Sequence, residues 1–286
     1  MRFARIGPLG QELPVVMVSE DAYVDIQDLT REIDGDFLAR LDTATLASEV
    51  ARRVASGQAQ LLGKARIGAP IARPHQVLCI GLNFSDHAAE TGMAIPEEPI
   101  VFNKAPNTVV GPNDDVVIPR GSLKTDWEVE LGVVMGAQTR YLNSPDEAMA
   151  HIAGFVLVND VSERAFQLER GGQWVKGKSC ETFNPCGPVL VTTDEIADVQ
   201  GLGMWLDVNG VRRQTGTTQT MVFDVSYLIW YLSQFLVLEA GDLINTGTPP
   251  GVGMGMTPQT FLQVGDVMEL GIDQLGTQRQ RLVSAK

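Results

Sequence analysis

Acidic and apolar residues alternate in the segment DWEVELGVVMG, residues 126–136, where the acids are Asp126, Glu128 and Glu130. Side chains alternate between the two faces of a β-strand, so the three acids would project from one face. The rise of a strand separates the Cβ atoms of Glu128 and Glu130 by roughly 7 Å. Carboxylates at that distance raise each other's pKa unless a cation lies between them. The pattern therefore raises the question of a cation site.

Alternating acids more often form the solvent-exposed face of an edge strand. Two features favour a buried site instead: the segment continues into the apolar run LGVVMG, and a second apolar strand, GFVLVND, ends in Asp160. Carboxylate oxygens, with the remaining positions left to water, suit a hard divalent ion such as Mg²⁺, Mn²⁺ or Ca²⁺. No Cys or His pair has the spacing of a zinc site, which argues against zinc.

A possible general base lies in GLNFSDHAAETG, where His87 and Glu90 are three residues apart. In a helical segment the two would share a face. A histidine oriented by a carboxylate is the usual arrangement for taking a proton from water. A surface histidine beside an acid is the commoner meaning of this spacing, but the pair directly follows the strand-like segment VLCIGLN, which favours a functional pair.

Residues 172–179, GQWVKGKS, match the phosphate-binding motif G-x-x-x-x-G-K-[ST]. Such a loop needs a buried strand before it and a helix that begins at its Lys-Ser. The preceding segment SERAFQLERGG is charged, and Pro185 and Gly187 would end a helix within two turns. We therefore interpret the match as chance, and Lys178 requires another explanation.

The chain has 286 residues, of which 44% are hydrophobic and 20% charged, and a net charge of -13. This charge argues against a nucleic-acid partner, while a metal or a few local cations could still attract a small anionic substrate. Three cysteines without C-x-x-C spacing indicate free thiols in a reducing compartment, and the N-terminus has no apolar signal core, so we predict a cytoplasmic protein. Residues 221–238 are apolar at helical spacing, which predicts a core-facing helix and no membrane span.

The first seventy residues differ from the rest of the chain. They combine short strand-like pieces with a helical segment over residues 36–57, and a Gly/Pro-rich linker follows at 68–76. We predict a small N-terminal α/β domain over residues 1–70 and a catalytic domain over residues 71–286.

Short β-rich segments dominate from Val77 onward, interrupted by two predicted helices. One covers residues 144–154, with Ser144 as its cap, and the other covers residues 224–238. Strands and helices do not alternate regularly, which excludes a doubly wound α/β sheet. The predicted fold class is α+β, dominated by β-strands.

Six segments, in this order, resemble the fumarylacetoacetate hydrolase family: GLNFSDHAAETG, DWEVELGVVMG, VLVNDVSERAFQ, GKSCETFNPCGP, GDLINTGTPPGVGMG and FLQVGDVMELGI. The resemblance runs from about Val77 to the C-terminus. The N-terminal domain and the ending MELGIDQLGTQRQRLV are most similar to the sugar-acid branch, which includes 2,4-diketo-3-deoxy-L-fuconate and -rhamnonate hydrolases. The resemblance implies a mixed β-roll and a homodimer.

The resemblance also implies three groups of site residues. The metal ligands, for Mg²⁺ or Mn²⁺ with Ca²⁺ as a substitute, are Glu128, Glu130 and Asp160. The catalytic residues, a water-activating pair on a lid segment and a substrate-facing lysine, are His87, Glu90 and Lys178. The residues near the bound carboxylate of the substrate are Arg164, Gln167 and Thr248.

The implied activity is metal-dependent hydrolysis of a carbon–carbon bond in a 2,4-dioxo acid, either an acylpyruvate or a 2,4-diketo-3-deoxy sugar acid, with release of pyruvate. Oxaloacetate decarboxylase, 2-hydroxyhepta-2,4-diene-1,7-dioate isomerase and ureidoglycolate lyase stay open as alternatives. A non-catalytic metal-binding scaffold is a further alternative. His87, Glu90 and Lys178 argue against it, because a scaffold needs no base.

Overall fold

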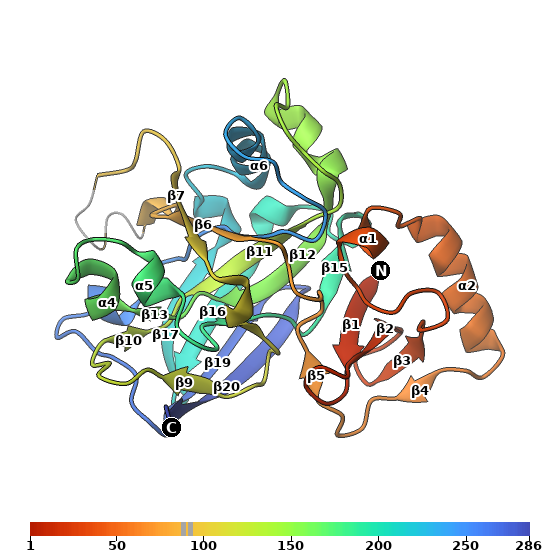
Figure 1. Cartoon of the computed structure of the whole chain (residues 1–286), viewed down its shortest axis with the longest axis horizontal. Coiled ribbons are helices and arrows are strands. Elements are labelled where there is room, and N and C mark those ends of the chain that lie inside the picture. The colour runs from red at the N-terminus through yellow and green to blue at the C-terminus, as the bar shows by residue number, and fades with distance from the viewer. Residues whose placement is uncertain (87–89, 91–93) are drawn as a thin grey trace.

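The computed structural model of the chain describes residues 1–86, 90 and 94–286, and two β-sheets dominate it (Figure 1). In the described residues the larger sheet has eleven strands, which are in spatial order β4 (Gln60–Leu61), β3 (Ala22–Asp25), β2 (Leu13–Met17), β1 (Arg2–Ile6), β15 (Leu190–Thr192), β12 (Ile152–Asn159), β11 (Val129–Met135), β18 (Leu243–Asn245), β6 (Val77–Gly81) and β7 (Ile100–Lys104), with β5 (Ile67–Gly68) paired to β1. The second sheet consists of β17 (Val211–Thr217), β16 (Gly203–Val208), β19 (Val267–Ile272), β20 (Gly276–Ser284) and β9 (Val116–Ile118). Two short pairs are β10 (Thr125–Asp126) with β13 (Ser162–Glu163), and β8 (Val109–Val110) with β14 (Asn184–Pro185).

Helices are short and lie around the sheets (Figure 1). The described α-helices are α1 (Gly35–Leu38), α2 (Thr43–Ala55), α4 (Arg164–Leu168), α5 (Val175–Lys178) and α6 (Val225–Ser233). The 3-10 helices are η1 (Pro106–Thr108), η2 (Pro145–His151), η3 (Thr193–Glu195), η4 (Val199–Gly201), η5 (Thr218–Thr220) and η6 (Gly253–Gly255).

The main hydrophobic core lies between the two sheets. Leu131 of β11 and Leu157 of β12 belong to the same buried cluster as Leu206 of β16 and Leu270 of β19. These strands are antiparallel neighbours within their sheets, and their alternating apolar residues point toward the opposite sheet. The predicted α+β class with a β-dominated mixed roll is confirmed.

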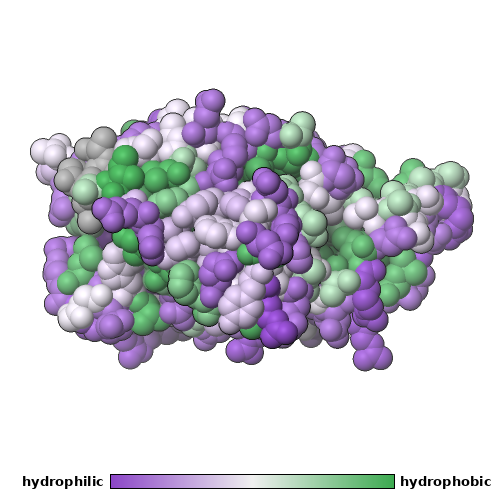
Figure 2. Space-filling model, turned by 90° about the horizontal axis from the view of Figure 1, so that it is seen from above, coloured by the Kyte–Doolittle hydropathy of each residue, from purple (hydrophilic) through white to green (hydrophobic). Residues whose placement is uncertain are grey.

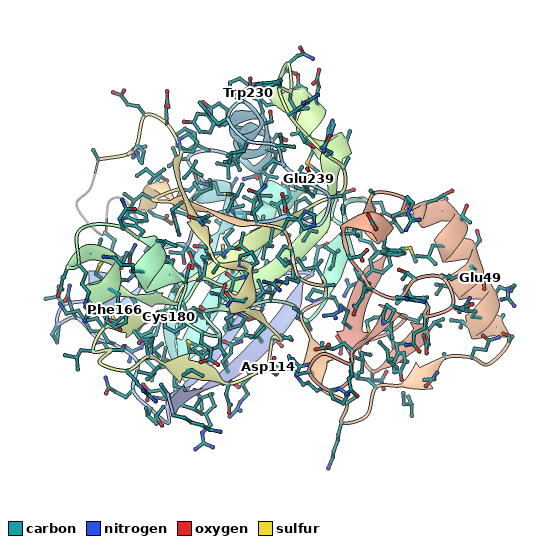
Figure 3. All side chains as sticks on the ribbon, in the orientation of Figure 1. Glu49, Asp114, Phe166, Cys180, Trp230 and Glu239 are labelled. Carbon is teal, nitrogen blue, oxygen red and sulfur yellow. The ribbon has the colours of Figure 1, made fainter. Side chains whose placement is uncertain are left out.

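The N-terminal strands extend the main sheet. β1 pairs antiparallel with β15, with Phe3 opposite Leu190. Arg66 also links the N-terminal strands to the rest of the molecule. Its guanidinium donates to both carboxylate oxygens of Asp114, at 2.8 and 2.6 Å, and to Glu12 at 2.7 Å. Figure 3 places Asp114 where the N-terminal part meets the rest of the molecule. The division into residues 1–70 and 71–286 stays a proposal.

The helices differ from the predictions in their boundaries. The segment predicted as one helix covers most of α1 and all of α2, because Asp42 begins a new helix by accepting a hydrogen bond from Thr45 N (3.0 Å). Residues 145–151 form the 3-10 helix η2, and the Ser144 side chain makes no cap hydrogen bond, so an α-helix with that cap was wrong. α6 has the predicted start, where Asp224 accepts from Tyr227 N (2.7 Å), but ends earlier, at Ser233.

The surface is mixed in character. Figure 2 shows hydrophilic residues over much of the upper face, with hydrophobic residues in separate groups. Among the described residues, none of the helices combines the length and the apolar composition that crossing a bilayer requires.

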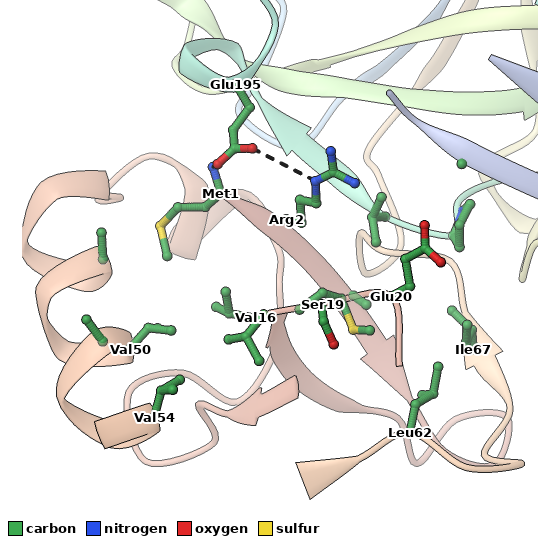
Figure 4. Close-up of a pocket in the computed structure, with 18 of the residues that line it drawn as sticks. Met1, Arg2, Val16, Ser19, Glu20, Val50, Val54, Leu62, Ile67 and Glu195 are labelled. Carbon is green, nitrogen blue, oxygen red and sulfur yellow. Dashed lines mark ion pairs between the residues drawn. The ribbon is translucent and has the colours of Figure 1, made fainter. Parts of the chain in front are cut away.

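A cavity of about 1090 Å³ lies between α2 and the strands β1 and β2 (Figure 4). Val16, Val50, Val54 and Leu62 contribute to its apolar walls. None of the acids predicted to bind a metal lines it. Glu128 and Glu130 line a smaller cavity beside β11 instead.

Candidate active site

Strand direction brings the candidate residues together at one end of the main sheet. β11 is antiparallel to β12 and to β18, and β18 is parallel to β6. The start of β11 therefore meets the ends of β12, β18 and β6. Val129 is opposite Asn159, and Asp160 N donates to the Glu128 carbonyl oxygen at 2.9 Å, so the acids at the start of β11 adjoin the acid that follows β12.

The structure brings Glu128, Glu130 and Asp160 together. Each offers a carboxylate oxygen, and these three atoms lie within 4.8 Å of one another. Their exposed fractions are only 6%, 1% and 1%, so the alternative of a solvent-exposed acidic face does not apply.

Asp126 does not belong to this group, although the alternation predicted that it would share the face of Glu128 and Glu130. It accepts hydrogen bonds from Gly253 N (2.6 Å) and from Arg164 Nε (2.9 Å). Asp126 thus holds the glycine-rich loop after β18 and an arginine of the site.

Three buried cations surround the acids. Lys178 Nζ donates to Glu128 Oε2 at 2.6 Å and to Asp160 Oδ2 at 2.8 Å, and Arg164 Nη2 donates to Glu128 Oε1 at 2.7 Å. Lys104 Nζ donates to Asp160 Oδ1 from the other side. With Asp126 there are four carboxylates against three cations, which leaves one excess negative charge when all are ionised.

The charges act on Glu128 and Glu130 in opposite directions. Burial disfavours the ionised form of Glu128, but the charges of Lys178 and Arg164 outweigh it and lower its pKa to about 2. Burial, followed by the charges of Asp160 and Glu128, raises the pKa of Glu130 well above its ordinary value. The pKa of Lys178 is raised, because its acidic neighbours outweigh the effect of burial.

A divalent cation fits the three carboxylates. Glu130 accepts a hydrogen bond from Gly247 N (2.9 Å) and has no ion pair within the described part of the chain. An added cation would therefore favour the ionised form of Glu130, which its surroundings now disfavour. Three anionic oxygens within reach of one another are the donors that Mg²⁺ and Mn²⁺ prefer.

Helices α4 and α5 form a hairpin that carries several candidate residues (Figure 3, where Phe166 lies on α4 and Cys180 follows α5). Arg164 and Gln167 come from α4, and Arg164 Nη1 donates to Gln167 Oε1 at 3.1 Å. Lys178 is the last residue of α5. A phosphate-binding loop needs a helix that begins at this lysine, so the geometry rules that interpretation out.

Gly177 allows the two helices of this hairpin to approach each other. A Cβ at this position would lie 2.6 Å from Gln167 N, a backbone atom that cannot rotate away. We expect Gly177→Ala to lower the free energy of unfolding by roughly 1–3 kcal/mol and to displace Lys178 from the acids. Urea unfolding followed by circular dichroism would measure the loss.

Gly201→Ala is the matched control for Gly177→Ala, because the three atoms nearest to its Cβ would all belong to the side chain of Asp198. An equal loss of stability in the two variants would contradict the tight contact at Gly177.

The glycine-rich loop after β18 forms another wall. Thr248 Oγ1 donates to Val129 O (2.9 Å) and accepts from Gln214 Nε2 (2.8 Å), which holds Thr248 at the pocket. Glu90 lies against the same loop, because its Oε1 accepts from Gly251 N at 3.0 Å. His87 lies outside the described residues.

Comparisons with known proteins identify the family of the chain. Residues 76–283 match the family described as fumarylacetoacetate (FAA) hydrolase C-terminal. The chain belongs to the fumarylacetoacetate hydrolase family. The 2,4-didehydro-3-deoxy-L-rhamnonate hydrolase of Sphingomonas sp. strain SKA58 is 48% identical over 283 residues, which cover 99% of this chain and 96% of the relative.

Solved structures of other proteins share the fold. The fumarylacetoacetate hydrolase of Exiguobacterium antarcticum superposes with a TM-score of 0.87 and 33% identity, over 100% of both chains. The 2-hydroxyhepta-2,4-diene-1,7-dioate isomerase of Mycobacterium marinum gives a TM-score of 0.77 and 28% identity, over 99% of this chain and 98% of that one. The predicted family, and an enzyme of the hydrolase type, are confirmed.

In this family member Glu128 and Glu130 open onto a cavity of about 210 Å³. Of the predicted residues, those that line it are Glu128, Glu130, Arg164, Gln167, Lys178 and Thr248. Asp160 lies behind Lys178 and Lys104, in contact with both.

Sequence reasoning missed Lys104 and the role of Asp126. Lys104 ends β7, is fully buried, and also donates to Phe183 O at 2.6 Å and Val161 O at 3.1 Å. The sequence does contain one signal for Lys104, because the strand-like run IVFNK ends in this lysine. A lysine buried at such a position needs several hydrogen-bond acceptors for its ammonium group, which indicates nearby acids or carbonyl oxygens.

Proposed function

We propose that the chain hydrolyses the C3–C4 bond of a 2,4-dioxo acid and releases pyruvate and a carboxylic acid. The observation that carries this proposal is the convergence of Glu128, Glu130 and Asp160, all buried, next to Lys178 at the end of the main sheet. Family membership and the 48% identity to a 2,4-didehydro-3-deoxy-L-rhamnonate hydrolase support it.

We assign metal binding to the same three carboxylates, with Mg²⁺ or Mn²⁺ as the ion. When bound, a divalent cation supplies Lewis-acid stabilisation of the negative charge that develops on substrate oxygens. The chain contributes the ligands and keeps them in position through Arg164 on Glu128 and Lys104 on Asp160.

Lys178 supplies a fixed positive charge inside the pocket. Its ammonium group lies between Glu128 and Asp160 and is almost fully buried, so it is held without needing to reorganise. A preorganised cation stabilises an enolate oxygen far better than water does. Arg164 and Gln167, which line the same pocket, are placed to orient the carboxylate of the substrate.

His87 and Glu90 are the proposed base and its orienting acid. His87 would accept a proton from water while the water oxygen adds to C4. The C3–C4 bond then breaks, its electron pair leaves with the pyruvate fragment as an enolate, and protonation at C3 gives pyruvate. Glu90 is held against the glycine-rich loop by its hydrogen bond from Gly251 N, next to the pocket wall formed by Thr248.

We expect His87→Ala to reduce hydrolysis of an acylpyruvate by at least about 100-fold, since positioned acid–base groups contribute factors of this size. The affinity for Mg²⁺ should stay unchanged, because His87 is no metal ligand in the proposal. Pyruvate release, coupled to lactate dehydrogenase, measures the rate, and calorimetry measures the metal affinity.

His75→Ala is the control for His87→Ala, because His75 is exposed and lies in the linker before β6. A fully active His87→Ala variant would exclude His87 as the base. No turnover of any 2,4-dioxo acid with Mg²⁺ or Mn²⁺, or full turnover in EDTA, would contradict the proposed function itself.

One second candidate has support. The likeness to a 2-hydroxyhepta-2,4-diene-1,7-dioate isomerase favours isomerisation through a similar enolate, without addition of water. The two reactions differ in their products, because only hydrolysis releases pyruvate. Assaying this diene-dioate beside an acylpyruvate decides between them. A homodimer and a cytoplasmic location stay predictions.

A further inference from the structure

Charged and apolar side chains both line the pocket beside the acids. The charged ones, which form what is called the charged end below, are Glu128, Glu130, Arg164 and Lys178. The apolar ones, which form the apolar end, include Leu82, Phe102, Leu168, Trp174 and Met254. A 2,4-dioxo acid whose carboxylate lies against the charged side chains would place its acyl end against apolar ones.

Two aromatic rings define the apolar end. The rings of Phe102 and Trp174 meet edge to face, with centroids 5.1 Å apart and planes at 64°. The Phe102 ring also lies 5.1 Å from Lys178 Nζ, so it forms the boundary between the two ends. Trp174 packs over Gly81, where a Cβ would come within 2.7 Å of the indole ring. A glycine at position 81 therefore allows the indole to close this side of the pocket.

The cations of the pocket are already paired with acids. Lys178 contacts Glu128 and Asp160, and Arg164 contacts Asp126 and Glu128. None of the other described residues that line the pocket is a lysine or an arginine. The segment HAAETGM, residues 87–93, also contains neither. A second carboxylate on the acyl end of a substrate would therefore find no lysine or arginine partner in these parts of the chain.

We propose that the site selects 2,4-dioxo acids whose acyl end is an uncharged alkyl group and discriminates against those that end in a second carboxylate. This selectivity rests on the proposed function and narrows its substrate class. Burial of an alkyl end against Phe102, Leu168 and Trp174 makes the free energy of binding more favourable. An ionised carboxylate placed there would lose its hydration without gaining a lysine or arginine partner among the described residues of the lining.

The test compares two substrates of equal length. 2,4-Dioxoheptanoate ends in a methyl group, and 2,4-dioxoheptanedioate ends in a carboxylate. With Mg²⁺ or Mn²⁺ present, we expect kcat/KM to be at least about 100-fold higher for the monoacid. Equal values, or a higher value for the diacid, overturn the proposed selectivity while leaving the hydrolase activity in place.

A charge added at the apolar end should change the preference. Leu168 lines the pocket and is 44% exposed, so an arginine there can keep contact with solvent. We expect Leu168→Arg to raise the ratio of diacid to monoacid kcat/KM by about tenfold. Leu61→Arg is the matched control, because Leu61 is 78% exposed on β4 and lies outside the pocket. A ratio in Leu168→Arg equal to that of the control contradicts the assigned role of this wall.

A binding measurement separates the selectivity from the reaction. 2-Oxopentanoate and 2-oxoglutarate have the same length, differ in a methyl versus a carboxylate end, and cannot undergo the hydrolysis. Calorimetry with the Mg²⁺-loaded protein should give at least tenfold tighter binding of 2-oxopentanoate. If this holds while neither dioxo acid is cleaved, the proposed function fails and the selectivity stands. Equal or tighter binding of 2-oxoglutarate overturns the selectivity.

Discussion

Glu130→Gln should abolish metal binding and reduce turnover by about 1000-fold or more, and yet make the metal-free protein more stable. The amide has the shape of the carboxylate, and its oxygen can still accept the hydrogen bond from Gly247 N. It removes the charge that burial and the neighbouring acids Asp160 and Glu128 disfavour. Since one pKa unit corresponds to about 1.4 kcal/mol, a gain of this order in the free energy of unfolding is expected.

The gain should depend on pH. The pKa of Glu130 is raised in the folded protein above its ordinary value of 4.5, so the proton on Glu130 stabilises the fold fully below pH 4.5. Above pH 4.5 the unfolded chain loses the Glu130 proton first. The stabilisation therefore falls until the pH exceeds the pKa of Glu130 in the folded protein. The difference in Tm between Glu130→Gln and the wild-type protein, both in EDTA, should therefore increase from about pH 4.5 upward.

Glu128→Gln should change the stability of the metal-free protein in the opposite direction to Glu130→Gln. The pKa of Glu128 is lowered to about 2 by Lys178 and Arg164 in spite of its burial, so its charge stabilises the fold. Removing it leaves two buried cations with one acid fewer, and we expect a loss of about 3 kcal/mol. The two variants should thus share the loss of Mg²⁺ binding in calorimetry and differ in the sign of the stability change. Retained Mg²⁺ affinity in Glu130→Gln would exclude it as a ligand.

The strand pattern and the acids of the site were predictable because both follow from a period of two. Glu128 and Glu130 alternate with apolar residues within a segment that is itself buried, and Asp160 ends another apolar strand. Placing the three acids together required strand order, which local pattern does not contain. The resemblance to the family supplied that step at the level of sequence, and the pairing of β11 with β12 explains it physically.

Other features could not be predicted because they depend on contacts between distant segments. Lys104 and Asp160 are 56 residues apart, and neither sequence neighbourhood indicates their contact. The sequence predicts N-terminal strands in a domain of their own, whereas Phe3 pairs with Leu190 and β1 extends the main sheet. In the sequence Asp126 fits the alternation of Glu128 and Glu130, and yet it lies on β10, separate from β11, and contacts Arg164. In each case tertiary pairing decides where a locally ordinary residue lies.

Lys178→Met should lower kcat by about 100- to 1000-fold and strengthen Mg²⁺ binding about tenfold. Lys178 Nζ contacts Glu128 and Asp160 at 2.6 and 2.8 Å, so its positive charge opposes a divalent ion at the same carboxylates. Its removal relieves that repulsion and takes away the fixed cation that stabilises the enolate. Because the pKa of Lys178 is raised, the wild-type residue is cationic throughout the assay range, and a change of pH should not restore the variant's rate.

Measuring the free energy of unfolding shows whether the lower kcat and the tighter Mg²⁺ binding of Lys178→Met arise from a general disturbance of the fold. Without metal, Lys178→Met leaves Glu128 with Arg164 and Asp160 with Lys104, so we expect a loss of about 3 kcal/mol that Mg²⁺ largely reverses. The rise in Tm on adding Mg²⁺ should then exceed that of the wild-type protein. Lys176→Met, which removes an exposed lysine of the same helix, should change neither rate nor affinity. Weaker Mg²⁺ binding in Lys178→Met would mean that the lysine assembles the carboxylates, and an unchanged kcat would remove it from the reaction.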